Sequence, residues 1–231
     1  MNAAASALAT RLAGIDENIA DAARNAGRSP DEITRIVVTK FHPASLVREL
    51  ADLGVHDVGE NRQQEFTAKA ADLADLPSLR WHFVGQVQTK KARAVRTAAS
   101  AVHAVDRVKL VQALDRAGEG LEPLDVFLQV NLTDDPARGG ASPDGIEELA
   151  EHIAAAETLR LQGVMSVAPL GEDPARAFAR LADYAERVRR IVPGATSMSA
   201  GMSQDFAEAI TAGATHLRIG TAITGARPAH G

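Results

Sequence analysis

A regular alternation of two kinds of segment runs through the whole chain and constrains its fold more than any other feature. One kind is short, apolar and rich in β-branched residues, as buried strands are. The other is longer and has apolar residues at helical spacing. Because no two strand-like segments follow each other directly, the pattern predicts parallel strands joined by crossover helices. The eight strand-like segments are residues 33–40, 54–61, 80–84, 101–105, 124–130, 161–167, 196–199 and 216–220.

Eight β–α units are the number that closes a (β/α)8 barrel, so we predict an α/β protein of the TIM-barrel type. An open, doubly wound sheet is the alternative that periodicity alone leaves open. The first strand is not followed by the G-x-G-x-x-G pattern of a dinucleotide-binding sheet. Residues 1–28 predict an extra N-terminal helix ahead of the barrel. Since we find no linker or low-complexity segment, we expect residues 1–231 to form a single domain.

Composition and charge argue against several functional classes. The formal net charge of −5 gives no basic footprint for nucleic acid. The absence of cysteine excludes disulfides, thiolate nucleophiles and sulfur-rich metal sites. No apolar run approaches the roughly 18 residues that span a bilayer, and the N-terminus lacks the features of a secretion signal. We therefore expect a cytoplasmic monomer that needs no metal and binds neither nucleic acid nor membranes.

The first strand-like segment ends in a lysine, which is the leading candidate for covalent chemistry. Residues 37–40 read V-V-T-K, and a proline follows at position 43. At the end of a buried strand, Lys40 is expected at the rim of a packed core rather than in free solvent. Burial disfavours the ammonium form of lysine, and the neutral amine is the form that condenses with an aldehyde to give a Schiff base. The alternative is a solvated lysine that closes a strand.

The last two loops of the predicted barrel have features of a phosphate site. Residues 199–205, S-A-G-M-S-Q-D, turn through a glycine into a helix and place Ser203 at an N-cap position. Backbone N–H groups and the helix dipole at such a turn favour an anion. Gly220 and Thr221 form a second small-residue turn, and barrels frequently bind phosphate with the loops after strands seven and eight. Alternatively, Ser203 only caps the helix and the glycines only turn the chain.

One ligand would use all three predicted features: the lysine at position 40, the phosphate site in the last two loops, and an arginine on the last strand. Pyridoxal 5′-phosphate (PLP) has an aldehyde for Lys40, a phosphate group, and a ring nitrogen that Arg218 can face. A guanidinium keeps that nitrogen unprotonated, because arginine does not give up its proton. The ring is then a weaker electron sink than it is with an aspartate partner. A salt bridge at the strand end is the alternative role for Arg218.

Seven short motifs occur in order along nearly the whole chain. They are V-V-T-K at 37–40, G-E-N at 59–61, W-H-F-V-G at 81–85, Q-V-N at 129–131, G-V-M-S at 163–166, G-M-S-x-D at 201–205 and R-I-G-T-A-I at 218–223. With these motifs the chain resembles the pyridoxal phosphate homeostasis protein family, which is similar in fold to the N-terminal barrel of alanine racemase.

The resemblance implies a protein that binds, buffers and delivers PLP inside the cell, without an established reaction of its own. It implies that PLP-dependent apo-enzymes are candidate partners. It also implies a cofactor role for eight residues: Lys40 in the Schiff base, Asn61, Met165 and Ser166 around the ring, Ser203, Gly220 and Thr221 at the phosphate, and Arg218 at the ring nitrogen.

Three positions depart from the family pattern. Residues 41–42 are F-H where a second lysine often follows the first, and residues 137–139 are A-R-G where a lysine often precedes the glycine. Residues 88–91 read Q-T-K-K in place of Q-x-N-K. These departures concern a secondary cofactor site and a lysine-dependent transfer step, and they leave the primary site unchanged.

A PLP-dependent amino-acid racemase is the alternative function. A racemase of the related fold needs an acid and a base on opposite faces of its substrate, usually with a tyrosine from an additional β domain. The chain ends at Gly231, and its only tyrosine, Tyr184, falls in a predicted surface helix that we expect to lie far from the strand ends. An open barrel mouth also fails to exclude water from a carbanion. A Schiff-base aldolase acting on a sugar phosphate would leave Arg218 unexplained.

Overall fold

The computed structural model describes residues 3–226, which form eight strands and the helices that connect them. The strands are β1 (Thr34–Val38), β2 (Asp57–Glu60), β3 (Arg80–Phe83), β4 (Ala101–Val105), β5 (Leu124–Gln129), β6 (Leu159–Met165), β7 (Ser197–Ser199) and β8 (His216–Ile219). The α-helices are α1 (Ala3–Asn25), α2 (Ala44–Asp52), α3 (Gln63–Asp72), α4 (Ala92–Ala98), α5 (Val108–Ala117), α6 (Ile146–Ala154), α7 (Pro174–Ile191), α8 (Phe206–Thr211) and α9 (Thr221–Thr224). Within residues 3–226 we find no helix with the length and apolarity that a bilayer crossing requires.

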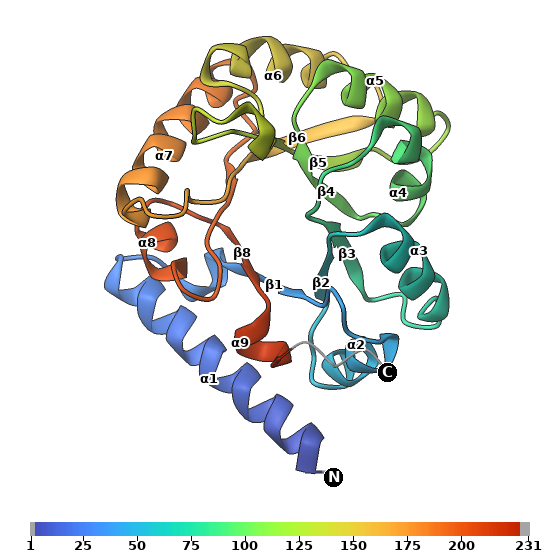
Figure 1. The fold of residues 1–231 in the computed structure, drawn as a ribbon, viewed down its shortest axis with the longest axis vertical. Helices are drawn as coiled ribbons and strands as arrows, with labels where there is room; N and C mark the ends of the chain where they lie inside the picture. The colour runs from blue at the N-terminus through green and yellow to red at the C-terminus, as the bar shows by residue number, and fades with distance from the viewer. Residues whose placement is uncertain (1–2, 227–231) are drawn as a thin grey trace.

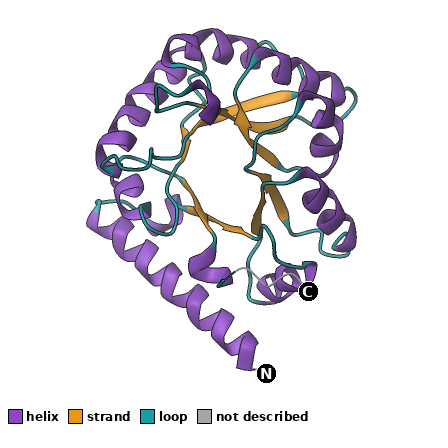
Figure 2. Ribbon diagram, viewed as in Figure 1, coloured by secondary structure: helices purple, strands orange, loops and turns teal. Residues whose placement is uncertain are grey.

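The eight strands pair in chain order and close into a barrel (Figure 1). Val37 of β1 faces Val58 of β2 on one side and Ile219 of β8 on the other, in parallel pairs that complete the ring. The helices surround the ring of strands on its outside (Figure 2). The predicted (β/α)8 barrel is therefore confirmed, and the open-sheet alternative is wrong.

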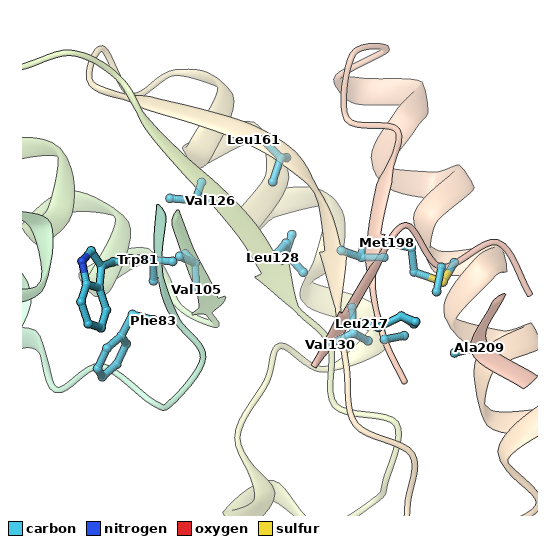
Figure 3. Close-up of a cluster of buried hydrophobic side chains, with 14 of the residues drawn as sticks. Trp81, Phe83, Val105, Val126, Leu128, Val130, Leu161, Met198, Ala209 and Leu217 are labelled. Carbon is cyan, nitrogen blue, oxygen red and sulfur yellow. The ribbon is translucent and has the colours of Figure 1, made fainter. Parts of the chain in front are cut away.

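The main hydrophobic core lies between the strands and the surrounding helices. Side chains alternate between the two faces of a strand, so Val126 and Leu128 of β5 belong to this core while Phe127 points into the barrel. Leu161 of β6 and Met198 of β7 belong to the same core as the outward-facing side chains of β5 (Figure 3). This layer holds the helices against the barrel and fixes the direction of each strand end.

The interior of the barrel is unusually polar. Barrels of this type are usually filled with layers of branched apolar side chains. Here a small apolar cluster of Ala104, Phe127 and Met165 occupies the interior. Several strands also carry buried side chains with hydrogen-bonding groups, namely His82, His103, Ser199 and Arg218.

Helix α1 lies outside the barrel and packs along α8 and α9 (Figure 1). Arg11 donates from Nε to the carbonyl oxygen of Ile223 at 2.7 Å, and Arg28 donates to the carbonyl oxygen of Ile210 at 3.0 Å. The extra N-terminal helix predicted for residues 1–28 is therefore present as Ala3–Asn25. The predicted domain, residues 1–231, includes residues at both ends that lie outside the described part of the chain.

Candidate functional site

The predicted site residues lie around one rim of the barrel. In a parallel barrel the C-terminal ends of all strands meet at the same face. Val38 pairs with Gly59 and Val37 with Ile219, so the loops after β1, β2 and β8 are neighbours. The eight residues are Lys40 after β1, Asn61 after β2, Met165 and Ser166 at the end of β6, Ser203 after β7, Arg218 on β8, and Gly220 and Thr221 after β8.

Lys40 lies at the rim of the barrel, but its side chain is exposed, so the prediction that it lies away from free solvent is wrong. Strand β1 ends at Val38, the side chain of Thr39 is still fully buried, and Lys40 lies in the turn that follows. The next residue, Phe41, has a φ of 69°, in the left-handed region that residues other than glycine seldom adopt. The Nζ atom of Lys40 lies 5.9 Å from the centre of the Phe41 ring. The amine is therefore at the barrel mouth and open to solvent.

A second lysine, which sequence reasoning missed, is buried directly behind this turn. Lys69 of α3 donates from Nζ to the carbonyl oxygen of Thr39 at 2.9 Å and to Oε1 of Glu60 at 2.5 Å. The Thr39 hydroxyl donates to the same Glu60 oxygen at 2.6 Å. Burial raises the pKa of Glu60 more than these hydrogen bonds lower it. The three side chains fasten α3 to the backbone that immediately precedes Lys40.

Arg218 is buried on β8, and its guanidinium is held from two sides. Nη1 donates to Oγ of Ser199 at 2.7 Å, and Nη2 donates to the carbonyl oxygen of Ser166 at 2.7 Å. Both partners are uncharged, which does not support the alternative of a salt bridge at the strand end. Burial lowers the pKa of Arg218 to about 10, against an opposite effect of Asp205. The side chain is still a cation at neutral pH.

Asn61 carries an unpaired hydrogen-bond acceptor directly after β2, whereas the Ser166 hydroxyl already has a partner. Oδ1 of Asn61 is buried and has no hydrogen-bond partner among the described residues. Buried polar atoms without a partner are uncommon, and a donor on a ligand satisfies such an atom. The Ser166 hydroxyl instead donates to the carbonyl oxygen of Val130 at 2.8 Å. Met165 packs in the apolar cluster of the barrel interior and offers a nonpolar surface below the mouth.

The turn after β7 differs from its prediction. Asp205 rather than Ser203 is the N-cap residue of α8, because the helix begins only at Phe206. Oδ1 of Asp205 already accepts a hydrogen bond from the N–H of Met202 at 2.6 Å. The dipole of this helix attracts an anion to its N-terminus, but the negative charge of the Asp205 carboxylate there repels one. The prediction that Ser203 caps the helix is therefore wrong, and Ser203 lies half-buried in the preceding turn.

The turn after β8 leads directly into the short helix α9. Gly220 is the N-cap residue of α9, and the exposed Thr221 is its first residue. The first turn of a helix leaves backbone N–H groups without partners inside the helix. Because β8 pairs with β1, these groups lie in the loop next to Lys40.

Sequence reasoning also missed the residues behind Arg218. Oγ of Ser199 lies 2.8 Å from Nδ1 of His103, and the His103 ring stacks on Phe127 with 4.3 Å between ring centres. Burial lowers the pKa of His103 well below its ordinary value, and the positive charge of Arg218 acts in the same direction. His103 is therefore a neutral imidazole at physiological pH.

Acid is expected to destabilise the protein through the half-buried His216. Burial lowers the pKa of His216 from 6.5 to about 4, and His82 acts in the same direction. Because the unfolded chain binds the proton more readily, the stability that neutral His216 provides is fully present above pH 6.5 and is lost as the pH falls toward 4. We expect the free energy of unfolding to decrease by about 2 kcal/mol for this residue between about pH 7 and pH 5, measured by urea unfolding.

A His216→Phe variant is expected to lose this part of the pH dependence, because phenylalanine does not titrate. Replacing the exposed His152 by glutamine is the control and is expected to leave the pH dependence unchanged. An equal decrease in stability in wild type and His216→Phe would contradict the assignment.

The tyrosine lies closer to the strand ends than predicted. Tyr184 of α7 lines a cavity of about 460 Å³ together with Asn131 and Leu132, which lie in the loop after β5. The guanidinium of Arg187 lies over its ring, 5.4 Å from the ring centre. The predicted surface helix is present, but the expectation that Tyr184 lies far from the strand ends is wrong.

The closed eight-stranded barrel, with polar side chains at the C-terminal ends of its strands, places the chain in a class of protein. This class is the (β/α)8 barrel that forms the N-terminal part of alanine racemases. The family described as "Alanine racemase, N-terminal domain" matches residues 11–228 of the chain. The solved alanine racemase from Corynebacterium glutamicum is similar in fold, with a TM-score of 0.68 and 17% identity. That match covers 94% of this chain and 62% of the racemase chain.

Within this class, the chain belongs to the pyridoxal phosphate homeostasis protein family. It is 40% identical over 223 residues to the "Pyridoxal phosphate homeostasis protein" of Pseudomonas aeruginosa, covering 96% of each chain. It is also similar to PipY of Synechococcus elongatus PCC7942, solved with PLP bound, with a TM-score of 0.83 and 33% identity. That match covers 94% of this chain and all of the PipY chain. The family indicated by the sequence motifs is confirmed.

Proposed function

We propose that this protein binds PLP in the cytoplasm and takes part in PLP homeostasis by holding the cofactor and delivering it to apo-enzymes. The observation that carries the proposal is the position of Lys40 and Arg218 on one barrel rim, with an exposed amine on one strand end and a buried, fixed guanidinium on the neighbouring strand. The PLP-bound structure of PipY and the name of the Pseudomonas relative support it.

The residues around the mouth fit the functional groups of PLP. Lys40 provides the amine that condenses with the aldehyde, with loss of water, to form the covalent link. Arg218 offers a permanently charged donor to the ring nitrogen, and Oδ1 of Asn61 offers an unpaired acceptor to the polar edge of the ring. Met165 and Ser166 lie at the β6 side of the ring. When bound, PLP supplies an electrophilic carbon and an electron-withdrawing ring.

We assign the phosphate group to the loops after β7 and β8. Gly220 and Thr221 offer backbone N–H groups and a hydroxyl at the start of α9, and Ser203 offers a second hydroxyl from the turn before α8. Asp205 already occupies the cap of α8, so the larger share of phosphate binding falls to the β8 loop. This loop and Lys40 lie on neighbouring strands, which suits one ligand that bridges them.

The proposed role is to carry the cofactor as a monomer, and not to turn over an amino-acid substrate. A guanidinium at the ring nitrogen leaves that nitrogen unprotonated, which limits the ability of the ring to stabilise a carbanion. The relatives are named as homeostasis proteins, whereas the likeness to alanine racemase, at 17% identity, concerns the fold alone. The racemase remains the alternative that an activity assay distinguishes.

The visible absorption spectrum of the purified protein tests the proposal. Protein incubated with PLP is expected to absorb in the visible range, to bleach when borohydride is added, and to carry the reduced pyridoxyl group at one equivalent per chain. A protein that stays colourless and unmodified at millimolar PLP would contradict the proposed function. Racemisation of an amino acid at a rate typical of enzymes, about 1 s⁻¹ or faster, would favour the racemase alternative.

A further inference from the structure

A continuous row of buried hydrogen bonds crosses the barrel interior behind the cofactor rim. It begins at Arg218, whose Nη1 donates to Oγ of Ser199, and continues 2.8 Å from that oxygen to Nδ1 of His103. Nε2 of His103 lies 2.9 Å from Nδ1 of His82, and Nε2 of His82 lies 2.9 Å from Oδ1 of Asp57. The row joins strands β8, β7, β4, β3 and β2.

The row ends at the opposite face of the barrel. Asp57 is the first residue of β2, and it is paired with Arg80, the first residue of β3. Both side chains line a cavity of about 340 Å³, and Asp16 and Arg35 line it as well. Burial disfavours ionisation of Asp57, but hydrogen bonds from Arg80 and His82 outweigh it and hold the Asp57 pKa well below its usual range. The row therefore has a fixed anion at one end and the Arg218 cation at the other.

The hydrogen atoms along the row have one consistent direction. Asp57 only accepts, so Nε2 of His82 is the donor to it. With His82 neutral, its Nδ1 accepts from Nε2 of His103, and Nδ1 of His103 then accepts from the Ser199 hydroxyl. Each residue of the row thus donates toward Asp57, and the side-chain polar atoms of Ser199, His103 and His82 all have partners.

The opposite direction is disfavoured. If His82 carried two protons, His103 would donate to Ser199, whose oxygen also accepts from Arg218. The Ser199 hydroxyl is fully buried, and its hydrogen atom would lose its partner in the row. The row would also hold a second buried cation in addition to Arg218.

From this geometry we infer that His103, His82 and Asp57 are positioning residues for Arg218, and that they form a directional relay which holds its guanidinium toward the ring nitrogen of the cofactor. In the relay the Ser199 hydroxyl donates its hydrogen atom to His103, so its oxygen can only accept a hydrogen bond from Arg218. Ser166 fixes the other nitrogen of the guanidinium. The remaining N–H groups of Arg218 therefore keep one orientation before the ligand arrives.

This inference rests on the proposed function, since it concerns the side of Arg218 that faces PLP. Its physical content is preorganisation. A fixed donor loses less conformational freedom when it binds than a mobile one does. The relay is thus expected to strengthen contact with the ring nitrogen, and to have little effect on contacts with the aldehyde or the phosphate.

Nitrogen NMR of the ligand-free protein tests the direction of the relay. Protein labelled with ¹⁵N-histidine is expected to show both His82 and His103 as neutral rings protonated at Nε2 near pH 7, with signals assigned by comparison with single variants. A doubly protonated His82, or a His103 protonated at Nδ1, would overturn the relay whatever the protein binds.

A comparison of two ligands tests the role of the relay. The probes are PLP and its carbocyclic analogue, in which CH replaces the ring nitrogen while the aldehyde and phosphate remain. We expect wild type to prefer PLP, and we expect His103→Phe, which retains the aromatic stack on Phe127, to reduce that preference by about tenfold, or about 1.4 kcal/mol. The control His216→Phe changes a neighbouring interior ring outside the relay and is expected to retain the full preference.

The possible outcomes distinguish a failure of the relay from a failure of the proposed PLP-binding function. A wild type that prefers PLP and a folded His103→Phe variant with the same preference would overturn the relay and leave the proposed function intact. A wild type that binds neither ligand would remove the proposed function, and the inference with it. If His103→Phe does not fold, Ser199→Ala breaks the row with loss of a single oxygen atom and is expected to give the same reduction.

Discussion

Replacing Lys40 by alanine is expected to abolish covalent attachment of PLP while leaving the protein folded. The Lys40 side chain is exposed, and substitutions at such positions usually change stability by less than about 0.5 kcal/mol. The expected result is a variant that has the circular dichroism spectrum and unfolding midpoint of the wild type but gains no mass after incubation with PLP and borohydride. Intact-protein mass spectrometry measures the gain, and peptide mapping of the wild type locates it.

The control for this experiment is Lys109→Ala, which removes an exposed lysine of α5. It is expected to be labelled at the wild-type level. If Lys40→Ala still gains one pyridoxyl group, the covalent site is another lysine, and the assignment of Lys40 is wrong. If the variant loses its fold, the turn after β1 has a structural role that the exposure of Lys40 does not indicate.

The largest loss of stability is expected from Lys69→Met. This change leaves Glu60 fully buried without its cationic partner and also removes the hydrogen bond to the carbonyl oxygen of Thr39. Breaking a buried ion pair by removing one partner typically costs about 3–5 kcal/mol. We expect the midpoint of urea unfolding at neutral pH to fall accordingly, with no change in its slope.

The matched control is the double variant Lys69→Met with Glu60→Gln, in which neither position of this ion pair carries a charge. It is expected to recover part of the stability, because a neutral amide is less costly to bury than an unpaired carboxylate. Equal stability of the single and double variants would show that the lost hydrogen bond to Thr39, rather than the unpaired charge of Glu60, causes the effect. Because Thr39 precedes Lys40, the single variant is also expected to form the PLP link more slowly.

The sequence was sufficient to predict the architecture, because strand and helix periodicity are local properties. The predicted limits of β4, residues 101–105, agree with those in the structure. Lys69 had a local signal that was overlooked. It lies three residues after Phe66 and four before Leu73, on the buried face of α3. A lysine in an apolar stripe indicates a buried partner.

Other features depend on information that the sequence does not carry locally. The exposure of Lys40 depends on the end of β1 at Val38, two residues earlier than the apolar pattern suggests. The cap of α8 falls on Asp205 because the turn after β7 is longer than the one expected at Ser203. The contact of His103 with Ser199 joins residues 96 positions apart, and it depends on how the strands face each other across the barrel.

The closure of the barrel has a consequence for synthesis of the chain. β1 forms near the start of the chain but pairs with β8 near its end, and Arg28 reaches Ile210 across 182 positions. Until β8 leaves the ribosome, β1 and the most recently made strand each present an open edge, which is a site for association with other chains. A nascent chain of this protein therefore spends most of its translation in an aggregation-prone state, and a stop codon before β8 would make that state permanent.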